Sequence, residues 1–192
     1  MEQKKIDYSS LYIARGIWEV WHDKNWDDFE DKKIREIVQN VVKTKERKNL
    51  ILYGKNGTGK TMLMNVAFKQ LFHDGFNVRI IDFRDLVRLY TKSFHGDDSY
   101  YELIDCDYLG IDDLDKEFKK SGAGSDMINT VLDYTLRYRF QRKLPTWITF
   151  NLLLSEVGTV YNQHIASLIK RSSQLLPFNG ADYGEKLVKK LS

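Results

Sequence analysis

Five short apolar runs recur along the chain, and their spacing restricts the folds that it can adopt. They cover residues 49–53, 78–82, 108–112, 147–150 and 175–178. Each of the first four is followed by a stretch in which apolar residues fall at helical spacing. Strands that alternate with helices in this way predict a parallel sheet covered by helices on both faces. The expected fold class is therefore α/β.

The length and composition of the chain fit one well-buried domain. It has 192 residues, of which 42% are hydrophobic. An amphipathic helix is predicted before the first apolar run, between about residues 32 and 47, where Ile34, Val38 and Val42 lie on one face. Residues 1–30 are an aromatic-rich segment that precedes this helix. Within it, Trp18 and its aromatic neighbours Trp21 and Trp26 are expected to pack against the domain, with the nearby region as a candidate adenine contact.

Charge and cysteine content exclude several classes of protein. The formal net charge of +3 is too small to indicate nucleic-acid binding, so any basic surface must be local. Cys106 is the only cysteine, which rules out an internal disulfide and a thiolate cluster for zinc. No apolar stretch approaches the roughly 20 residues of a membrane helix, and the first residues lack an apolar signal core. We expect a soluble, cytoplasmic protein with no membrane partner.

A glycine-rich loop follows the first predicted strand and carries the clearest chemistry. Residues 54–61 match the phosphate-loop pattern of Gly, four residues, then Gly-Lys-Thr. Lys60 would neutralise the β and γ phosphates of a nucleoside triphosphate, and the Thr61 hydroxyl would ligate Mg²⁺. The alternative is a glycine-rich turn with a chance lysine. The predicted ATP-binding residues are Gly54, Lys55, Asn56, Gly57, Thr58, Gly59, Lys60, Thr61 and Met62.

Polar residues at the ends of two later strands point to hydrolysis. Asp112 ends the run at 108–112 and Asp113 follows it, at the same edge of the sheet as the phosphate loop. We expect Asp112 to hold the Mg²⁺ shell and Asp113 to polarise a water for attack on the γ-phosphate. Asn151 follows the next strand and is placed to bond that water or the γ-phosphate. The alternatives are a helix cap for the acidic pair and a turn-forming role for Asn151.

These motifs together resemble a known family. Residues 53–63, 108–117, 139–151 and 175–180 resemble, in this order, the DnaC/IstB-type branch of the AAA+ ATPases, which includes replicative-helicase loaders. The resemblance covers about residues 25–190. It implies a P-loop fold of five strands with little or no separate lid, in which the strand ending at Asn151 lies between the two strands that carry the nucleotide site. Asn151 would then be the sensor 1 residue.

The resemblance also implies partners. Members of this branch assemble in the presence of ATP into an open spiral on single-stranded DNA and deliver a hexameric helicase. The expected partners are therefore single-stranded DNA, a replicative hexameric helicase and further copies of this chain. Loaders usually carry an N-terminal domain that grips the helicase. Only 48 residues precede the first strand here, so this contact would be missing or would fall to a short N-terminal segment.

Two departures from the family pattern concern arginines. The family commonly has a Ser-Arg pair before the last strand, where this chain has Ser167 and Leu168, so Arg171 is the substitute candidate for the residue that reaches a neighbour's ATP. Near the end of the chain, where a Tyr-Arg pair is common, Gly184 replaces the arginine and Lys186 is a weak stand-in. Slow intrinsic hydrolysis, stimulated by DNA or a partner, would follow.

A candidate DNA contact follows soon after the strand that ends at Asp112. Phe118 lies beside Lys119 and Lys120, and an aromatic ring next to lysines suits single-stranded DNA. The alternative is a solvated charged loop.

Four functions remain open from the sequence. The first is an ATPase of DNA replication that loads a helicase, with an ATPase domain over residues 31–192. The others are a transposition helper that acts on duplex DNA, a small-molecule kinase with the same phosphate loop, and a scaffold that binds ATP without hydrolysis. No arginine-rich lid of the kinase kind is evident.

Overall fold

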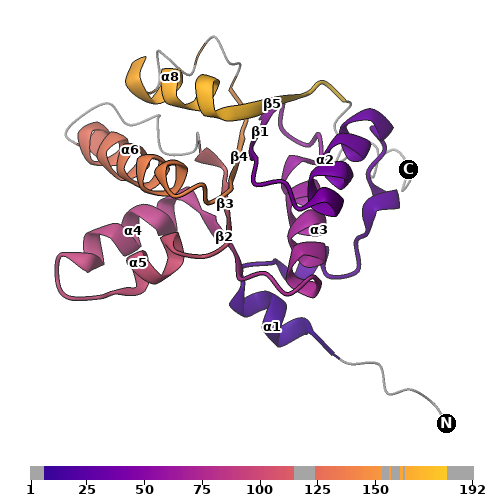
Figure 1. The fold of residues 1–192 in the computed structure, drawn as a ribbon, viewed down its shortest axis with the longest axis horizontal. Coiled ribbons are helices and arrows are strands. Elements are labelled where there is room, and N and C mark those ends of the chain that lie inside the picture. Colours follow the sequence, from indigo (N-terminus) through magenta and orange to yellow (C-terminus); the bar gives the residue numbers. More distant parts are fainter. Residues whose placement is uncertain (1–6, 115–123, 153–155, 157–160, 162, 181–192) are drawn as a thin grey trace, which may run out of the picture.

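A computed structural model describes residues 7–114, 124–152, 156, 161 and 163–180 of the chain. Its centre is a five-stranded parallel sheet with strand order β2-β3-β4-β1-β5 (Figure 1). All five apolar runs are confirmed as strands, with ends that differ by one or two residues for β1, β4 and β5. The strands are β1 (Asn49–Gly54), β2 (Val78–Asp82), β3 (Tyr108–Asp112), β4 (Thr146–Phe150) and β5 (Ser173–Phe178). As the family resemblance implies, β4 lies between β1 and β3.

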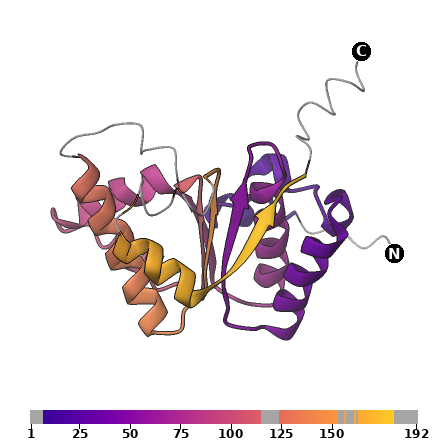
Figure 2. The same cartoon turned by 90° about the horizontal axis from the view of Figure 1, so that it is seen from above.

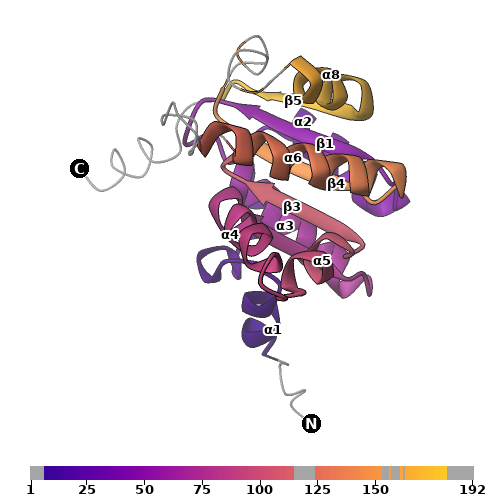
Figure 3. The same cartoon turned by 90° about the vertical axis from the view of Figure 1, so that its left-hand side faces the viewer.

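Helices cover both faces of the sheet, which confirms the predicted α/β class (Figure 2). One face carries α2 (Lys32–Thr44) and α3 (Lys60–His73), which share a buried apolar cluster with the sheet. Figure 3 shows the opposite layer in front of the strands. It consists of α4 (Phe83–Ser93), α5 (Ser99–Ile104), α6 (Gly124–Gln141) and α8 (Gln163–Ser172), around a second cluster.

Helix α2 forms where the apolar spacing predicts it. It buries Ile34, Val38, Val41 and Val42. At its start, Asp31 is the N-cap, and its side chain accepts the backbone N–H of Ile34 at 3.1 Å. The last helical residue is Thr44, and the C-cap Lys45 has a left-handed φ of 54° that closes the last turn. These caps fix the helix three residues short of the predicted end at residue 47.

The N-terminal segment packs along the edge strand β2. It contains α1 (Ser9–Ala14) and two short 3-10 helices, η1 (Glu19–Trp21) and η2 (Trp26–Asp28). The backbone N–H of Ile80 donates to the carbonyl of Arg15 at 2.8 Å. A Cβ on Gly16 would lie 1.9 Å from the carbonyl oxygen of Ile80, and Gly16 has a φ of 76°. Only glycine allows this close approach, which covers part of the exposed sheet edge.

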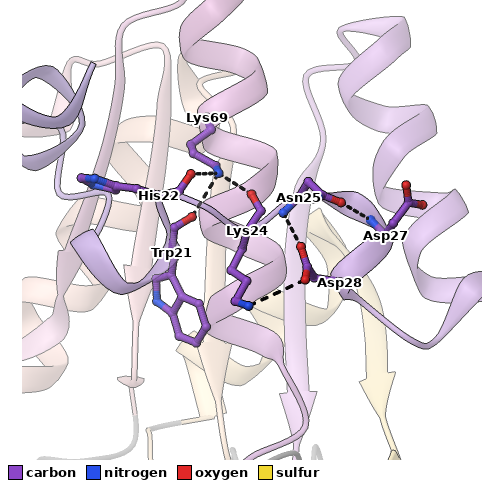
Figure 4. A network of polar contacts seen from close by, with 7 residues as sticks. All are labelled: Trp21, His22, Lys24, Asn25, Asp27, Asp28 and Lys69. Carbon is purple, nitrogen blue, oxygen red and sulfur yellow. Dashed lines mark hydrogen bonds and ion pairs between the residues drawn. The ribbon is translucent and has the colours of Figure 1, made fainter. Parts of the chain in front are cut away.

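Helix α3 holds this segment through two side chains. The ammonium group of Lys69 donates to the carbonyls of Trp21, His22 and Lys24, at 3.0 Å and 2.7 Å for the first two (Figure 4). Asn65 accepts the backbone N–H of Trp18 at 3.2 Å. Because α3 begins at the phosphate loop, these contacts join the N-terminal segment to the helix that carries the loop.

The predicted aromatic packing holds for two of the three tryptophans. Trp21 and Trp26 pack against the buried cluster of α2 and α3. Trp18 is instead 53% exposed, so the packing prediction is wrong for it. Its backbone N–H binds Asn65, while the ring is left on the surface. None of the helices in the described part of the chain is long and apolar enough to span a membrane.

Candidate nucleotide-binding site

The phosphate loop connects the carboxyl end of β1 to the first turn of α3, as predicted. Gly57 and Gly59 have φ values of 74° and 87°, which other residues rarely adopt. Gly54 has a φ of 135°, and a Cβ there would lie 2.2 Å from the carbonyl oxygen of Phe178 on β5. The first glycine is therefore required by the packing of β1 against β5, in addition to any approach of a phosphate. The N-terminal, positive end of the α3 dipole lies at the loop.

Lys60 lies within the loop and is only 6% exposed. Its ammonium group donates to the carbonyls of Gly54 at 2.7 Å and Lys55 at 2.6 Å. The hydroxyl of Thr58 in turn donates to the carbonyl of Lys55 at 2.9 Å. The ammonium group of a lysine is a charged hydrogen-bond donor, which forms strong bonds to the oxygens of an anion. The loop is thus suited to phosphate.

Asp112 joins this loop to β3. Its Oδ1 accepts a hydrogen bond from the Thr61 hydroxyl at 3.0 Å and another from the Thr149 hydroxyl on β4. Asp112 is buried, with 5% of the residue exposed. A hydroxyl and a carboxylate at one point are hard oxygen ligands, and Mg²⁺ typically takes one or two such groups together with substrate phosphates. Within the described residues there is no cluster of three His, Cys, Asp or Glu side chains that could hold a metal without a substrate. Thr61 and Asp112 therefore fit a magnesium ion that is bound with a nucleotide.

Asp113 and Asn151 lie at the ends of neighbouring strands. Asp113 follows β3 directly, and Asn151 follows β4 directly. The two strands are paired in parallel, with Ile111 opposite Ile148, so both residues leave the sheet at the edge that carries the phosphate loop. Asp113 has a left-handed φ of 53°, and its backbone N–H donates to the Thr149 hydroxyl at 2.9 Å.

A cavity of about 280 Å³ adjoins the loop. It is lined by Phe29, Ile34 and Phe178, with Thr58 of the loop. The rings of Phe29 and Phe178 pack against each other with their centroids 5.7 Å apart, so the cavity lies beside this buried apolar pair and is a candidate space for a nucleobase. The tryptophans are not among the residues that line it. Phe29, three residues beyond Trp26, belongs to the nearby region that the sequence offers as a candidate adenine contact, and this contact stays a prediction. The chain pattern alone gave no sign of Phe29 or Phe178, because each is brought to the loop by packing.

Arg171 lies far from the loop of its own chain. It is exposed near the end of α8, directly before β5 begins at Ser173. In Figure 2, β1 and β5 run upward and α8 ends at the lower edge of the sheet. β5 has six residues, and at about 3.3 Å per residue it separates Arg171 from the loop edge by roughly 20 Å. The remaining candidates, Phe118, Lys119, Lys120 and Lys186, lie outside the described residues.

Fold and site together have the arrangement of a P-loop nucleotide-binding domain. No family model matches the chain. The replicative helicase loader DnaI of Bacillus subtilis (strain 168) is 26% identical over 128 residues, which cover 65% of this chain and 40% of that protein. The chain thus matches less than half the length of this curated relative.

Solved structures of replication proteins share the fold. The crystal structure of the DnaC helicase loader aligns with a TM-score of 0.71 at 23% identity, over 84% of this chain and 100% of that one. The replication initiator DnaA bound to AMPPCP and single-stranded DNA aligns with a TM-score of 0.66 at 15% identity, over 87% of this chain and 53% of that one. The predicted resemblance to the DnaC/IstB-type ATPases is confirmed.

Proposed function

We propose that the chain binds and hydrolyses ATP with Mg²⁺ and serves as a loader of a replicative helicase. The observation that carries this proposal is the meeting of Lys60, Thr61 and Asp112 at one edge of the sheet, with strand order β2-β3-β4-β1-β5. Similarity to a replicative helicase loader supports a function in DNA replication. The duplex-binding transposition helper is not favoured, because the relatives described above are replication proteins.

Each residue of the site has a part in this proposal. Lys60 and the backbone N–H groups of the loop bind the phosphates, and the base lies in the cavity that Phe29 and Phe178 line. Thr61 and Asp112 hold magnesium, which when bound neutralises charge on the phosphate oxygens. Asp113 takes a proton from the attacking water, and Asn151 orients that water. Lys60 and Thr61 begin α3, and Asp112, Asp113 and Asn151 lie at or just after the ends of β3 and β4, so the sheet brings these residues to one edge.

Assembly and DNA binding extend the same proposal. Arg171 cannot reach its own loop across the sheet, so a role at ATP requires a second copy of the chain. The family resemblance supports such an ATP-dependent homo-oligomer around single-stranded DNA, and the neighbour DnaA was solved with single-stranded DNA bound. A replicative hexameric helicase would be the cargo, which fits the similarity to a replicative helicase loader.

ATP turnover, titrated with a single-stranded oligonucleotide and in parallel with its duplex, tests this function. We expect the single strand to raise turnover and the duplex to have a much smaller effect. Stimulation by duplex alone would move the assignment to a transposition helper. Transfer of phosphate to a small acceptor in place of water would reinstate the kinase. Tight ATP binding with no turnover under either condition would leave a nucleotide-dependent scaffold.

A further inference from the structure

Thr149 contacts both acidic residues of the site with one hydroxyl group. It lies on β4 with its side chain fully buried, beside the end of β3. The hydroxyl donates to the carboxylate of Asp112 and accepts the backbone N–H of Asp113 at 2.9 Å. A hydroxyl can do both at once because it has one donor hydrogen and two acceptor lone pairs. Its methyl group and β-branching restrict the side chain to few rotamers, so the oxygen is held in place.

The backbone of Asp113 needs such support. Its φ of 53° lies in the left-handed region, which residues with a side chain adopt at a cost. In a continuing strand, the Asp113 side chain would leave the face opposite to that of Asp112. The left-handed turn changes this direction at the residue predicted to act on the water. Among the hydrogen bonds of the described residues, the one from Asp113 N–H to Thr149 fixes this turn from the neighbouring strand.

We propose that Thr149 is a positioning residue for ATP hydrolysis. Its hydroxyl sets the rotamer of Asp112 and holds the turn at Asp113, so that the two carboxylates keep different orientations. The inference rests on the proposed ATPase function. It assigns no contact with substrate to Thr149, which acts only through the two aspartates.

β4 provides a matched control in Thr146. Both threonines are fully buried on the same strand, and both hydroxyls are bonded. The Thr146 hydroxyl accepts from the Arg139 guanidinium at 2.9 Å, at the opposite end of the strand from the site. Valine has nearly the same shape as threonine, so replacement of either residue by valine removes the buried hydroxyl and changes the packing little. The two variants should therefore lose similar stability, while only one disturbs the carboxylates.

The experiment compares Thr149→Val, Thr149→Ser and Thr146→Val with the native chain. We expect Thr149→Val to lower turnover at saturating ATP by at least about tenfold, because a hydrogen bond to a charged group is lost. The KM for ATP should stay within about threefold of the native value, since the phosphate loop is intact. Thr149→Ser keeps the hydroxyl and should recover most of the turnover. Thr146→Val should turn over ATP at a near-native rate after correction for the folded fraction.

Amide hydrogen exchange at Asp113 gives a second readout, which needs neither nucleotide nor activity. Asp113 follows the last residue of β3, yet its N–H should exchange slowly in the native chain and in Thr149→Ser, and much faster in Thr149→Val. An Asp113 amide that exchanges at the unprotected rate in the native chain would overturn the inference, even if Thr149→Val did not fold.

The outcomes separate this inference from the proposed function. If the native chain shows no ATP turnover with either form of DNA, the ATPase proposal fails, and the exchange experiment still decides whether Thr149 holds Asp113. If the native chain hydrolyses ATP and Thr149→Val does so equally well, the positioning role is wrong. An equal loss in Thr149→Val and Thr146→Val would make the effect one of stability alone, which also contradicts the inference.

Discussion

Thr61 and Asp112 are 51 positions apart in the chain, yet the Thr61 hydroxyl donates to Oδ1 of Asp112 at 3.0 Å. Thr61 follows β1 and Asp112 ends β3, and these strands are separated in the sheet by β4. The contact forms because all three strands are parallel and end at the same edge. Thr149 on the middle strand meets the same carboxylate from β4. The candidate magnesium site therefore depends on the register of three strands as well as on the phosphate loop.

Replacement of Asp113 by asparagine should separate ATP binding from turnover. The variant keeps the backbone N–H that bonds Thr149 and loses only the basic oxygen, so the fold of the turn should survive. We expect turnover to fall by about 10²- to 10⁴-fold, which is the usual contribution of a general base. ATP affinity, measured by titration with a fluorescent analogue, should change little.

Asp112→Asn is the matched comparison for this variant. It should weaken binding of the nucleotide in the presence of Mg²⁺ while leaving binding without Mg²⁺ nearly unchanged, because Asp112 is the predicted ligand. Unchanged turnover in Asp113→Asn would assign the activation of water to another group.

Most of the elements near the site could be predicted from the sequence because their causes are local. The apolar runs gave the five strands, and the order Gly-Lys-Thr after β1 gave the loop. The position of β4 between β1 and β3 came from the family resemblance. Periodicity contains no information about which strands are neighbours in a parallel sheet.

Features that depend on distant contacts were not predictable in this way. Helix α5 has six residues, which is too short for an apolar period to stand out. In the sequence, nothing distinguishes Lys69 from an ordinary surface lysine of α3, although it donates to three carbonyls of the N-terminal segment. Thr149 lies in β4, which is buried throughout, and nothing in the sequence distinguishes it from any other strand threonine. Its partners on β3 become visible only with the strand register.

Arg139 on α6 is a buried cation on which the fold depends. It is fully buried, and its guanidinium donates to the carbonyls of Ile104 at 2.6 Å, Cys106 at 2.9 Å and Pro145 at 2.7 Å. Burial lowers the pKa of this guanidinium from its usual value, and the nearby Cys106 opposes the shift. The side chain therefore ties the end of α5 to the turns before β3 and β4.

Arg139→Met should lower the free energy of unfolding by about 3–5 kcal/mol, because several buried carbonyls lose their donor. Arg142→Met is the control, in the turn that directly follows α6. Arg142 is exposed and stacks over the Tyr138 ring at 3.7 Å, so its loss should cost less than about 1 kcal/mol. Urea denaturation measures both values. Equal stability of the two variants would show that the Arg139 contacts contribute little.

Cys106 should make stability depend on alkaline pH. Burial raises the pKa of its thiol from 9.0 to about 11, with the nearby Arg139 acting in the opposite direction. The folded chain thus holds its proton more tightly than the unfolded chain. This contribution to stability is complete below pH 9 and is lost as the pH rises from 9 to about 11. Urea denaturation across this range should show a smaller decline in Cys106→Ala than in the native chain.

Thiol labelling gives an independent check on Cys106. Because the thiolate is the reactive form, the buried thiol should react at pH 8 only when the chain opens. The labelling rate should therefore rise with urea in parallel with unfolding. Rapid labelling of the folded chain at pH 8 would contradict the burial and the raised pKa.

Arg171 can be tested for action between copies of the chain by mixing two inactive variants. Lys60→Ala loses the cation that binds phosphate, so its ATP affinity should fall by at least roughly tenfold, while its Arg171 stays intact. Arg171→Ala should bind ATP normally, because Arg171 lies at the opposite edge of the sheet from its own loop. Its turnover should be low, since the charge supplied to the neighbour is missing.

In a mixture, an Arg171→Ala copy holds ATP and a Lys60→Ala copy supplies the arginine. Turnover should therefore exceed the sum of the two separate variants and should depend on total protein concentration. Lys170→Ala, an exposed neighbour on α8, should behave like the native chain and controls for the loss of surface charge. A mixture that is no more active than its parts, with Lys60→Ala folded and able to join the assembly, would remove Arg171 from the ATP site.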